Sequence, residues 1–158
     1  MSVRFIVDNN VGKLAKWLRT MGYDAFFFKD IDDDKMVRIA LSQDRVLLTK
    51  DRQVLKRRVV TSGKLKAVLI KDDDSKMQLA SVIRQLNLNC NFKPFSLCLE
   101  CNEKLIRRAK DQVRDRVPTY VFQTQEEYTE CPACHRIYWR GTHWESMRKE
   151  LERLISNT

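Results

Sequence analysis

The chain has 158 residues, which is long enough for a buried core. Its composition, with 43% hydrophobic residues and only 4 Gly and 3 Pro, excludes a disordered protein. Its 30 Lys and Arg against 21 Asp and Glu give a formal charge of +9, which favours nucleic acid over a membrane as partner, with a solvated basic surface as the alternative. No apolar run approaches the roughly 18 residues of a spanning helix and no signal peptide is recognisable, so we expect a cytoplasmic protein.

Strand and helix patterns alternate four times along the first part of the chain. Short apolar runs predict strands at residues 3–7, 25–28, 46–49 and 67–70. Helical periodicity predicts helices from 11 to about 21, over about 36–41, over about 54–63, and from 75 to about 86, the last with Ser75 and Gln78 as a capping box. This alternation predicts a doubly wound parallel α/β sheet, with the strand at 46–49 buried on both faces.

Aspartates follow the predicted strands. Asp8 ends the first strand, a run at 30–34 follows the second, Asp51 follows the third, and Asp72 to Asp74 follow the fourth. The carboxyl ends of parallel strands meet at one edge of a sheet, where such charges repel unless a cation neutralises them. Carboxylates suit Mg²⁺ or Mn²⁺, so we expect a divalent metal there. The alternative is that each aspartate only caps a helix or forms a turn.

Cysteine spacing predicts a second metal site. Two C-x-x-C pairs, separated by 29 residues, predict a tetrahedral structural Zn²⁺ site with Cys98, Cys101, Cys131 and Cys134 as ligands. Disulfides are the alternative, and Cys90 is expected to be a buried free thiol. Asn102 and His135 directly follow the two pairs. Both residue types tolerate a left-handed backbone, so we interpret His135 as a turn residue rather than a fifth ligand.

The composition changes near residue 90, which divides the chain into an α/β domain at 1–92 and a zinc-ribbon module at 93–158. The module is predicted to end in a helix that begins with a capping box at Thr142 and Glu145. Both histidines of the chain lie in this module, which excludes histidine base chemistry from the α/β domain.

Basic and aromatic residues alternate after the second cysteine pair. Arg136 and Arg140 either offset the charge of the thiolates or form a face that binds RNA phosphates. Tyr138 and Trp139 either stack on bases or fill the small core of the ribbon, and Trp144 is left open between these roles.

Several motifs together resemble a known family. They are the run from Val7 to Arg19, Gly22-Tyr23-Asp24, the run from Leu47 to Arg52, the two cysteine pairs, and the run from Ile137 to His143. They look like the PIN-like ribonuclease domains with an appended zinc ribbon, which also occur at the C-terminus of mutator-type exonucleases. The resemblance covers nearly the whole chain.

The resemblance implies a PIN-like fold whose acidic residues bind Mg²⁺ or Mn²⁺ and cleave RNA. Asp8 and Asp51 match two of these acids, and Thr49 would orient Asp51. The middle acid falls on Asp33, with Asp34 as a close competitor. A fourth acid has no secure counterpart, although Asp72 to Asp74 can supply one.

We therefore expect metal-assisted hydrolysis of RNA, with a structural zinc. Three lysines near the strand ends are expected to guide the RNA backbone, namely Lys13, Lys16 and Lys50. The first alternative is a non-catalytic RNA-binding or adaptor protein, which has no need of three carboxylates at one edge. The second is a receiver-type domain, which accounts for neither the cysteine pairs nor the positive charge.

Overall fold

The structure is a computed structural model that describes residues 2–90 and 92–156, apart from the side chains of Thr142 and His143. Four strands form a parallel sheet in the order β2-β1-β3-β4, as the sequence predicted for a parallel α/β protein. The strands are β1 (Phe5–Val7), β2 (Ala25–Phe26), β3 (Val46–Thr49) and β4 (Ala67–Leu69). All of β3 is buried, as predicted for a strand with neighbours on both sides and helices on both faces.

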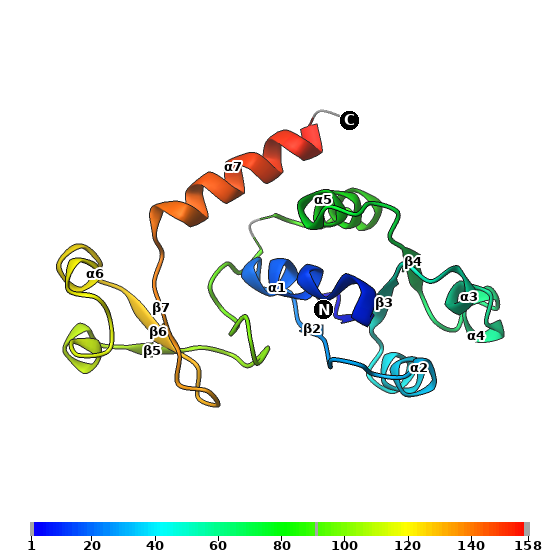
Figure 1. The fold of residues 1–158 in the computed structure, drawn as a ribbon, viewed down its shortest axis with the longest axis horizontal. Coiled ribbons are helices and arrows are strands. Elements are labelled where there is room, and N and C mark those ends of the chain that lie inside the picture. Colours follow the sequence, from blue (N-terminus) through cyan, green and yellow to red (C-terminus); the bar gives the residue numbers. More distant parts are fainter. Residues whose placement is uncertain (1, 91, 157–158) are drawn as a thin grey trace.

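Helices connect the strands and cover both faces of the sheet (Figure 1). They are η1 (Asn9–Val11), α1 (Gly12–Thr20), α2 (Asp33–Ser42), α3 (Arg52–Leu55), α4 (Arg58–Thr61) and α5 (Ser75–Leu86). Val7 and Leu48 face a core shared with α1 and α5, whereas Ile6 and Leu47 face a core shared with α2 and α3. Successive strand side chains point to opposite faces, which is why adjacent residues enter different cores.

Two local predictions are wrong. The single helix expected over 54–63 is two short helices, α3 and α4, because Arg57 between them has an extended backbone. The cap of α5 is Asp74 rather than Ser75, since the Asp74 carboxylate accepts hydrogen bonds from the N–H groups of Lys76 and Met77. The Gln78 amide donates instead to the carbonyl of Asp72, so the predicted capping box does not form.

The part of the chain that the sequence predicted to be a zinc-ribbon module, which we call the ribbon, contains a small antiparallel sheet in the order β5-β6-β7. Its elements are β5 (Ile106–Arg108), η2 (Lys110–Val113), α6 (Thr119–Thr124), β6 (Tyr128–Glu130) and β7 (Ile137–Tyr138). Val113, Val121 and Tyr128 form its core, and Trp139 packs against them. The core interpretation of Trp139 is therefore confirmed, since a module this small needs large side chains to bury enough apolar surface.

The last helix, α7 (Thr142–Ser156), leaves the ribbon and lies along α5 (Figure 1). Trp144, Met147 and Leu151 are buried in the same core as α1 and α5. Trp144, left open by the sequence, thus belongs to the α/β core. The predicted cap at Thr142 lies outside the described side chains. Among the described residues, no helix is both long and apolar enough to cross a bilayer.

The first cysteine pair is fastened to the α/β domain by side chains that the sequence did not single out. The Asn102 amide donates to the Asp24 carboxylate at 2.6 Å, and its oxygen accepts from the N–H of Ala25 at 3.1 Å. The buried Arg19 guanidinium of α1 bonds the carbonyls of Ala25 and Leu99 at 2.9 and 2.7 Å. The ribbon is thus attached both at this pair and through α7.

Candidate active site and metal centre

Asp8 and Asp51 follow the neighbouring strands β1 and β3, at the carboxyl edge of the sheet. The Asp8 side chain is buried, and its carboxylate accepts hydrogen bonds from the N–H of Asn9 at 2.7 Å and from the Thr49 hydroxyl at 2.6 Å. The Asp51 carboxylate caps α3 by accepting from the N–H of Gln53 at 2.8 Å. Both acids therefore have a fixed orientation, and both also serve as caps.

Thr49 connects these two acids. Its hydroxyl donates to Asp8 and accepts the backbone N–H of Asp51 at 3.0 Å. The resemblance implied that Thr49 orients the Asp51 carboxylate, and this is wrong in detail. A hydroxyl has one proton to donate. That proton goes to Asp8, so Thr49 positions Asp51 only through its backbone.

Asp33 is the first residue of α2, after the cap residue Asp32. Partial burial, and then the negative charges of Asp8 and Asp51, raise the pKa of its carboxyl above the usual value. Asp33 thus lies within electrostatic reach of both other acids. The oxygens of the three carboxylates do not all lie within 4.8 Å of one another. Among the described residues, only the four cysteines bring their ligand atoms that close together.

The competing acids have other partners. Asp34 is exposed and forms an ion pair with Arg57 at 2.7 Å. Asp73 pairs with Lys50, and Asp74 caps α5.

The basic residues singled out from the sequence lie in different surroundings. Lys13 borders a polar hollow of about 510 Å³ beside Asn9 and Asn10, close to Asp8. Lys16 pairs with Glu100 at 2.8 Å.

The four cysteines gather at one point, and their Sγ atoms all lie within 4.8 Å of one another. Four sulfurs about 2.3 Å from a tetrahedral zinc stand about 3.8 Å apart. The sulfurs of Cys98 and Cys134 are 3.7 Å apart, which fits a shared metal and is far too long for a disulfide. All four of these cysteines are free thiols in the structure, so the disulfide alternative is wrong and the group can hold a metal such as zinc.

The two cysteine pairs form matching turns. The N–H of Asn102 donates to the carbonyl of Cys98, and the N–H of His135 donates to that of Cys131, both at 2.9 Å. Asn102 and His135 both have φ of 64°, so the predicted left-handed exits are confirmed. The His135 ring bonds the Glu130 carboxylate at 2.9 Å rather than facing the sulfurs.

Electrostatics also favour a cation among the sulfurs. Burial, and then hydrogen bonding to Cys134, raises the pKa of the Cys101 thiol to about 12. The backbone N–H of Arg136 lowers that of Cys134 to about 6. One thiol thus resists ionisation while its neighbour ionises, and a bound dication allows all of them to ionise. Arg136 offsets thiolate charge, since its guanidinium hydrogen-bonds Cys134.

The remaining ribbon residues have structural contacts. The Arg140 guanidinium lies 5.2 Å from the ring centre of Phe95. The Tyr138 hydroxyl accepts the N–H of Leu99 at 3.2 Å and contacts the sulfur of Cys98 at the same distance. Cys90 is a free thiol, as expected, but it is half-buried rather than buried, and this partial burial raises its pKa.

The sequence pattern predicted no role for Glu130 in β6. Its buried carboxylate forms hydrogen bonds with Arg116, His135 and Arg108. These contacts lower its pKa to about 2, with Arg116 contributing most and Arg108 least. The available signal was an acid directly before a cysteine pair, in a module that is rich in arginine. Pairing within the ribbon thus accounts for part of its basic charge.

Fold and site together define a mixed α/β protein with a four-stranded parallel sheet and a four-cysteine group that can hold zinc. Over residues 3–151 the chain matches the model of the Mut7-C RNAse domain, and it belongs to that family. The resemblance seen in the motifs is thereby confirmed. The family indicates a ribonuclease-type function with RNA as the class of substrate. The comparisons with curated proteins and with solved structures gave no match.

Proposed function

We propose that the chain is a Mg²⁺- or Mn²⁺-dependent ribonuclease that hydrolyses RNA phosphodiester bonds at Asp8, Asp33 and Asp51. The observation that carries this proposal is the Thr49 hydroxyl, which bonds the Asp8 carboxylate and the Asp51 backbone at one edge of the sheet. The negative charges of Asp8 and Asp51 help to raise the pKa of Asp33, which supports Asp33 as a third carboxylate at this edge. Three such charges repel one another, and a hard divalent cation relieves that repulsion.

The partners of the neighbouring acids support this choice of three. Asp33 rather than Asp34 is the middle acid, because Asp34 is exposed and paired with Arg57. Asp73 and Asp74 are engaged by Lys50 and by the first turn of α5, which favours a site of three acids over one of four.

The protein itself orients the carboxylates through hydrogen bonds. Asp8 is oriented by two hydrogen bonds, and Asp51 uses one carboxylate oxygen as a cap and keeps the other for an ion. A bound divalent ion would lower the pKa of a coordinated water to give the nucleophile and would stabilise charge on the phosphate. Lys13, beside this edge, is suited to bind the RNA backbone.

We infer that residues 1–92 are a doubly wound PIN-like nuclease domain and that 93–158 are a zinc-ribbon module. Helices on both faces of the sheet support the first inference. The zinc is structural, since four thiolates fill its tetrahedral shell. Arg136 and Arg140 would bind RNA only with the part of each guanidinium that Cys134 and Phe95 leave free.

The test is cleavage of a panel of labelled RNAs by the purified chain with Mn²⁺ or Mg²⁺. Asp8→Asn is expected to lower the rate by roughly 100-fold or more, because it removes a carboxylate ligand. Asp44→Asn is the matched control. Asp44 is exposed and lies before β3, and asparagine tolerates its positive φ of 52°.

Cleavage by Asp8→Asn at the wild-type rate would identify a contaminating nuclease and refute the assignment. RNA binding without cleavage by the wild-type chain in either metal would instead favour the adaptor function.

A further inference from the structure

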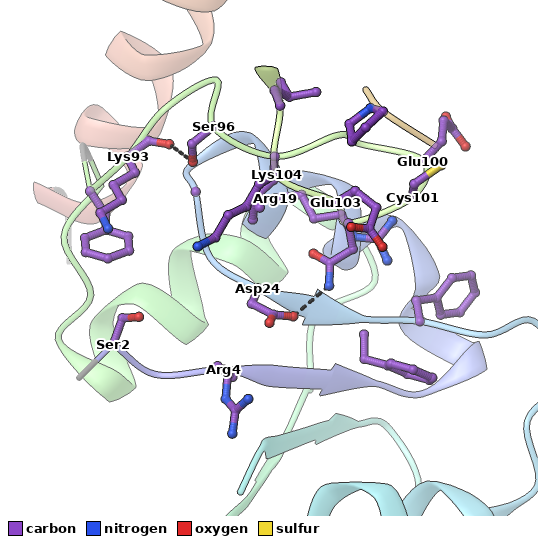
Figure 2. Close-up of a pocket in the computed structure, with 18 of the residues that line it drawn as sticks. Ser2, Arg4, Arg19, Asp24, Lys93, Ser96, Glu100, Cys101, Glu103 and Lys104 are labelled. Carbon is purple, nitrogen blue, oxygen red and sulfur yellow. Dashed lines mark hydrogen bonds between the residues drawn. The ribbon is translucent and has the colours of Figure 1, made fainter. Parts of the chain in front are cut away.

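A cleft of about 1190 Å³ lies between β2, an edge strand of the parallel sheet, and the first cysteine pair (Figure 2). We call it the β2 cleft. One wall comes from the sheet and includes Arg4, Asp24 and residues 26–28, and the other comes from residues 92–106. The proposed catalytic acids do not line it, so this cleft is separate from the carboxylate edge.

Two large apolar side chains in the cleft are exposed. Phe28 is 59% exposed and Ile106 is 43% exposed, and they lie on opposite walls. The preceding Phe27 is fixed, because its ring packs so tightly on Gly12 that an added Cβ there would approach it to 2.8 Å. Phe28 is exposed instead, with the Lys35 ammonium 5.4 Å from its ring centre. More than half of this aromatic side chain is thus accessible to solvent.

The charges in the cleft suit an anion. It is lined by five basic and three acidic side chains. Two of the acids are already paired, since Asp24 bonds Arg45 and Asn102, and Glu100 bonds Lys16.

Lys93 and Lys104 are exposed and have no carboxylate partner in the described part of the chain, and both are labelled in Figure 2. The cleft also borders Cys101, and a zinc held by four thiolates is formally anionic. Arg136 lies against Cys134 and offsets part of that charge. Lys93 and Lys104 are therefore left available for phosphates.

The cleft leads toward the carboxylate edge. Phe28 begins the loop that ends at Asp33, and the N–H of Ile31 donates to the carbonyl of Phe28 at 3.2 Å. The N–H of Asp30 in this loop donates to the Asn9 side chain at 3.1 Å, next to Asp8. The loop that begins at Phe28 thus connects the cleft with the segments that carry Asp8 and Asp33.

We propose that the β2 cleft binds single-stranded RNA, with bases against Phe28 and Ile106 and phosphates against Lys93 and Lys104. Its role in feeding the carboxylate edge rests on the proposed ribonuclease function, whereas the binding itself does not. The RNA is single-stranded because only an unstacked base can lie on an exposed ring. A duplex keeps its bases stacked and covered.

The experiment measures binding of a fluorescent oligouridylate by anisotropy, with Asp8→Asn as the parent chain and no added Mg²⁺ or Mn²⁺. Phe28→Ala is expected to weaken binding about 5- to 150-fold, the range for loss of one stacked base. Lys104→Ala is expected to weaken binding and to reduce the salt slope by about 0.7. Tyr120→Ala and Lys149→Ala are matched controls, because both residues are exposed and neither lines the cleft.

Unchanged affinity in both Phe28→Ala and Lys104→Ala would overturn the proposal, as would equal losses in the control variants. Equally tight binding of a duplex that depends on the same two residues would overturn the single-strand specificity. Phe28 is exposed, so thermal melts are expected to show that Phe28→Ala remains folded.

The two proposals can fail separately. If the wild-type chain cleaves no RNA but binds the oligouridylate through Phe28, the cleft stands and the ribonuclease function falls. If it cleaves RNA and Phe28→Ala leaves both binding and KM unchanged, the ribonuclease function stands and the cleft falls.

Discussion

At the scale of single residues, Thr49 shows how one hydroxyl organises two acids. It is fully buried, and it bonds the Asp8 carboxylate and the Asp51 backbone. Thr49→Val keeps the shape of the side chain and removes both bonds. We expect a loss of roughly 1–3 kcal/mol in the free energy of unfolding, because Asp8 loses a hydrogen bond to a charged group, and a marked fall in RNA cleavage.

Thr49→Ser is the matched control for this variant, since it restores the hydroxyl. Chemical denaturation and cleavage assays check both effects. Full activity in Thr49→Val would show that Asp8 and Asp51 do not need this link.

A substitution at Asp51 tests whether this residue is a metal ligand or only a helix cap. The Asp51→Asn variant removes one negative charge and keeps the cap, because the amide oxygen of asparagine can still accept the N–H of Gln53. Without divalent metal we expect the melting temperature to be unchanged or raised by up to about 3 °C, because repulsion with Asp8 and Asp33 falls. With Mn²⁺ we expect the wild type to be stabilised and the variant not.

Thermal melts of both proteins with chelator and with Mn²⁺ make this comparison, with Asp44→Asn as control. Equal metal-induced shifts in wild type and Asp51→Asn would exclude Asp51 as a ligand.

At the scale of elements, the two cysteine turns hold a ribbon whose own core is small. We expect one zinc per wild-type chain. Cys131→Ser is expected to lose it and to expose residues from about 96 onward to proteolysis, since binding of a structural metal is coupled to folding. Cys90→Ser is the matched control and should keep the zinc. Elemental analysis and limited proteolysis followed by mass spectrometry provide the measurements.

Zinc retention by Cys131→Ser would contradict the four-cysteine site. Loss of zinc with unchanged protease resistance would show that the ribbon is held by its contacts with the α/β domain instead.

At the scale of the whole molecule, α7 ties the end of the chain to the α/β core. Trp144 packs edge-to-face on Phe95, with ring centroids 4.9 Å apart, and is 4% exposed. Trp144→Ala is expected to lower the free energy of unfolding by about 3–5 kcal/mol, as for other buried aromatic side chains. The exposed Tyr120→Ala should change it by less than about 0.5 kcal/mol.

Urea denaturation followed by circular dichroism measures both variants. A change in Trp144→Ala as small as that in Tyr120→Ala would show that α7 is dispensable for the stability of the α/β core.

The sequence by itself determined the features that depend on local pattern. Alternating apolar runs and helical periods predicted four parallel strands with helices between them, because burial of apolar faces follows directly from periodicity. The spacing of two cysteine pairs predicted the four-sulfur group, and residue type predicted the left-handed exits at Asn102 and His135. Each of these can be recognised from residue type and spacing along the chain.

Only the tertiary structure decided which partners meet across the fold. Arg57, from another connection, forms an ion pair with Asp34, and this contact is our reason for proposing Asp33 as the middle acid. Thr49 was turned toward Asp8 because β1 and β3 are adjacent, which no local pattern encodes. Trp144 became part of the α/β core, and Phe28 remained exposed in the β2 cleft, because packing between segments distant in sequence decides which apolar side chains are covered.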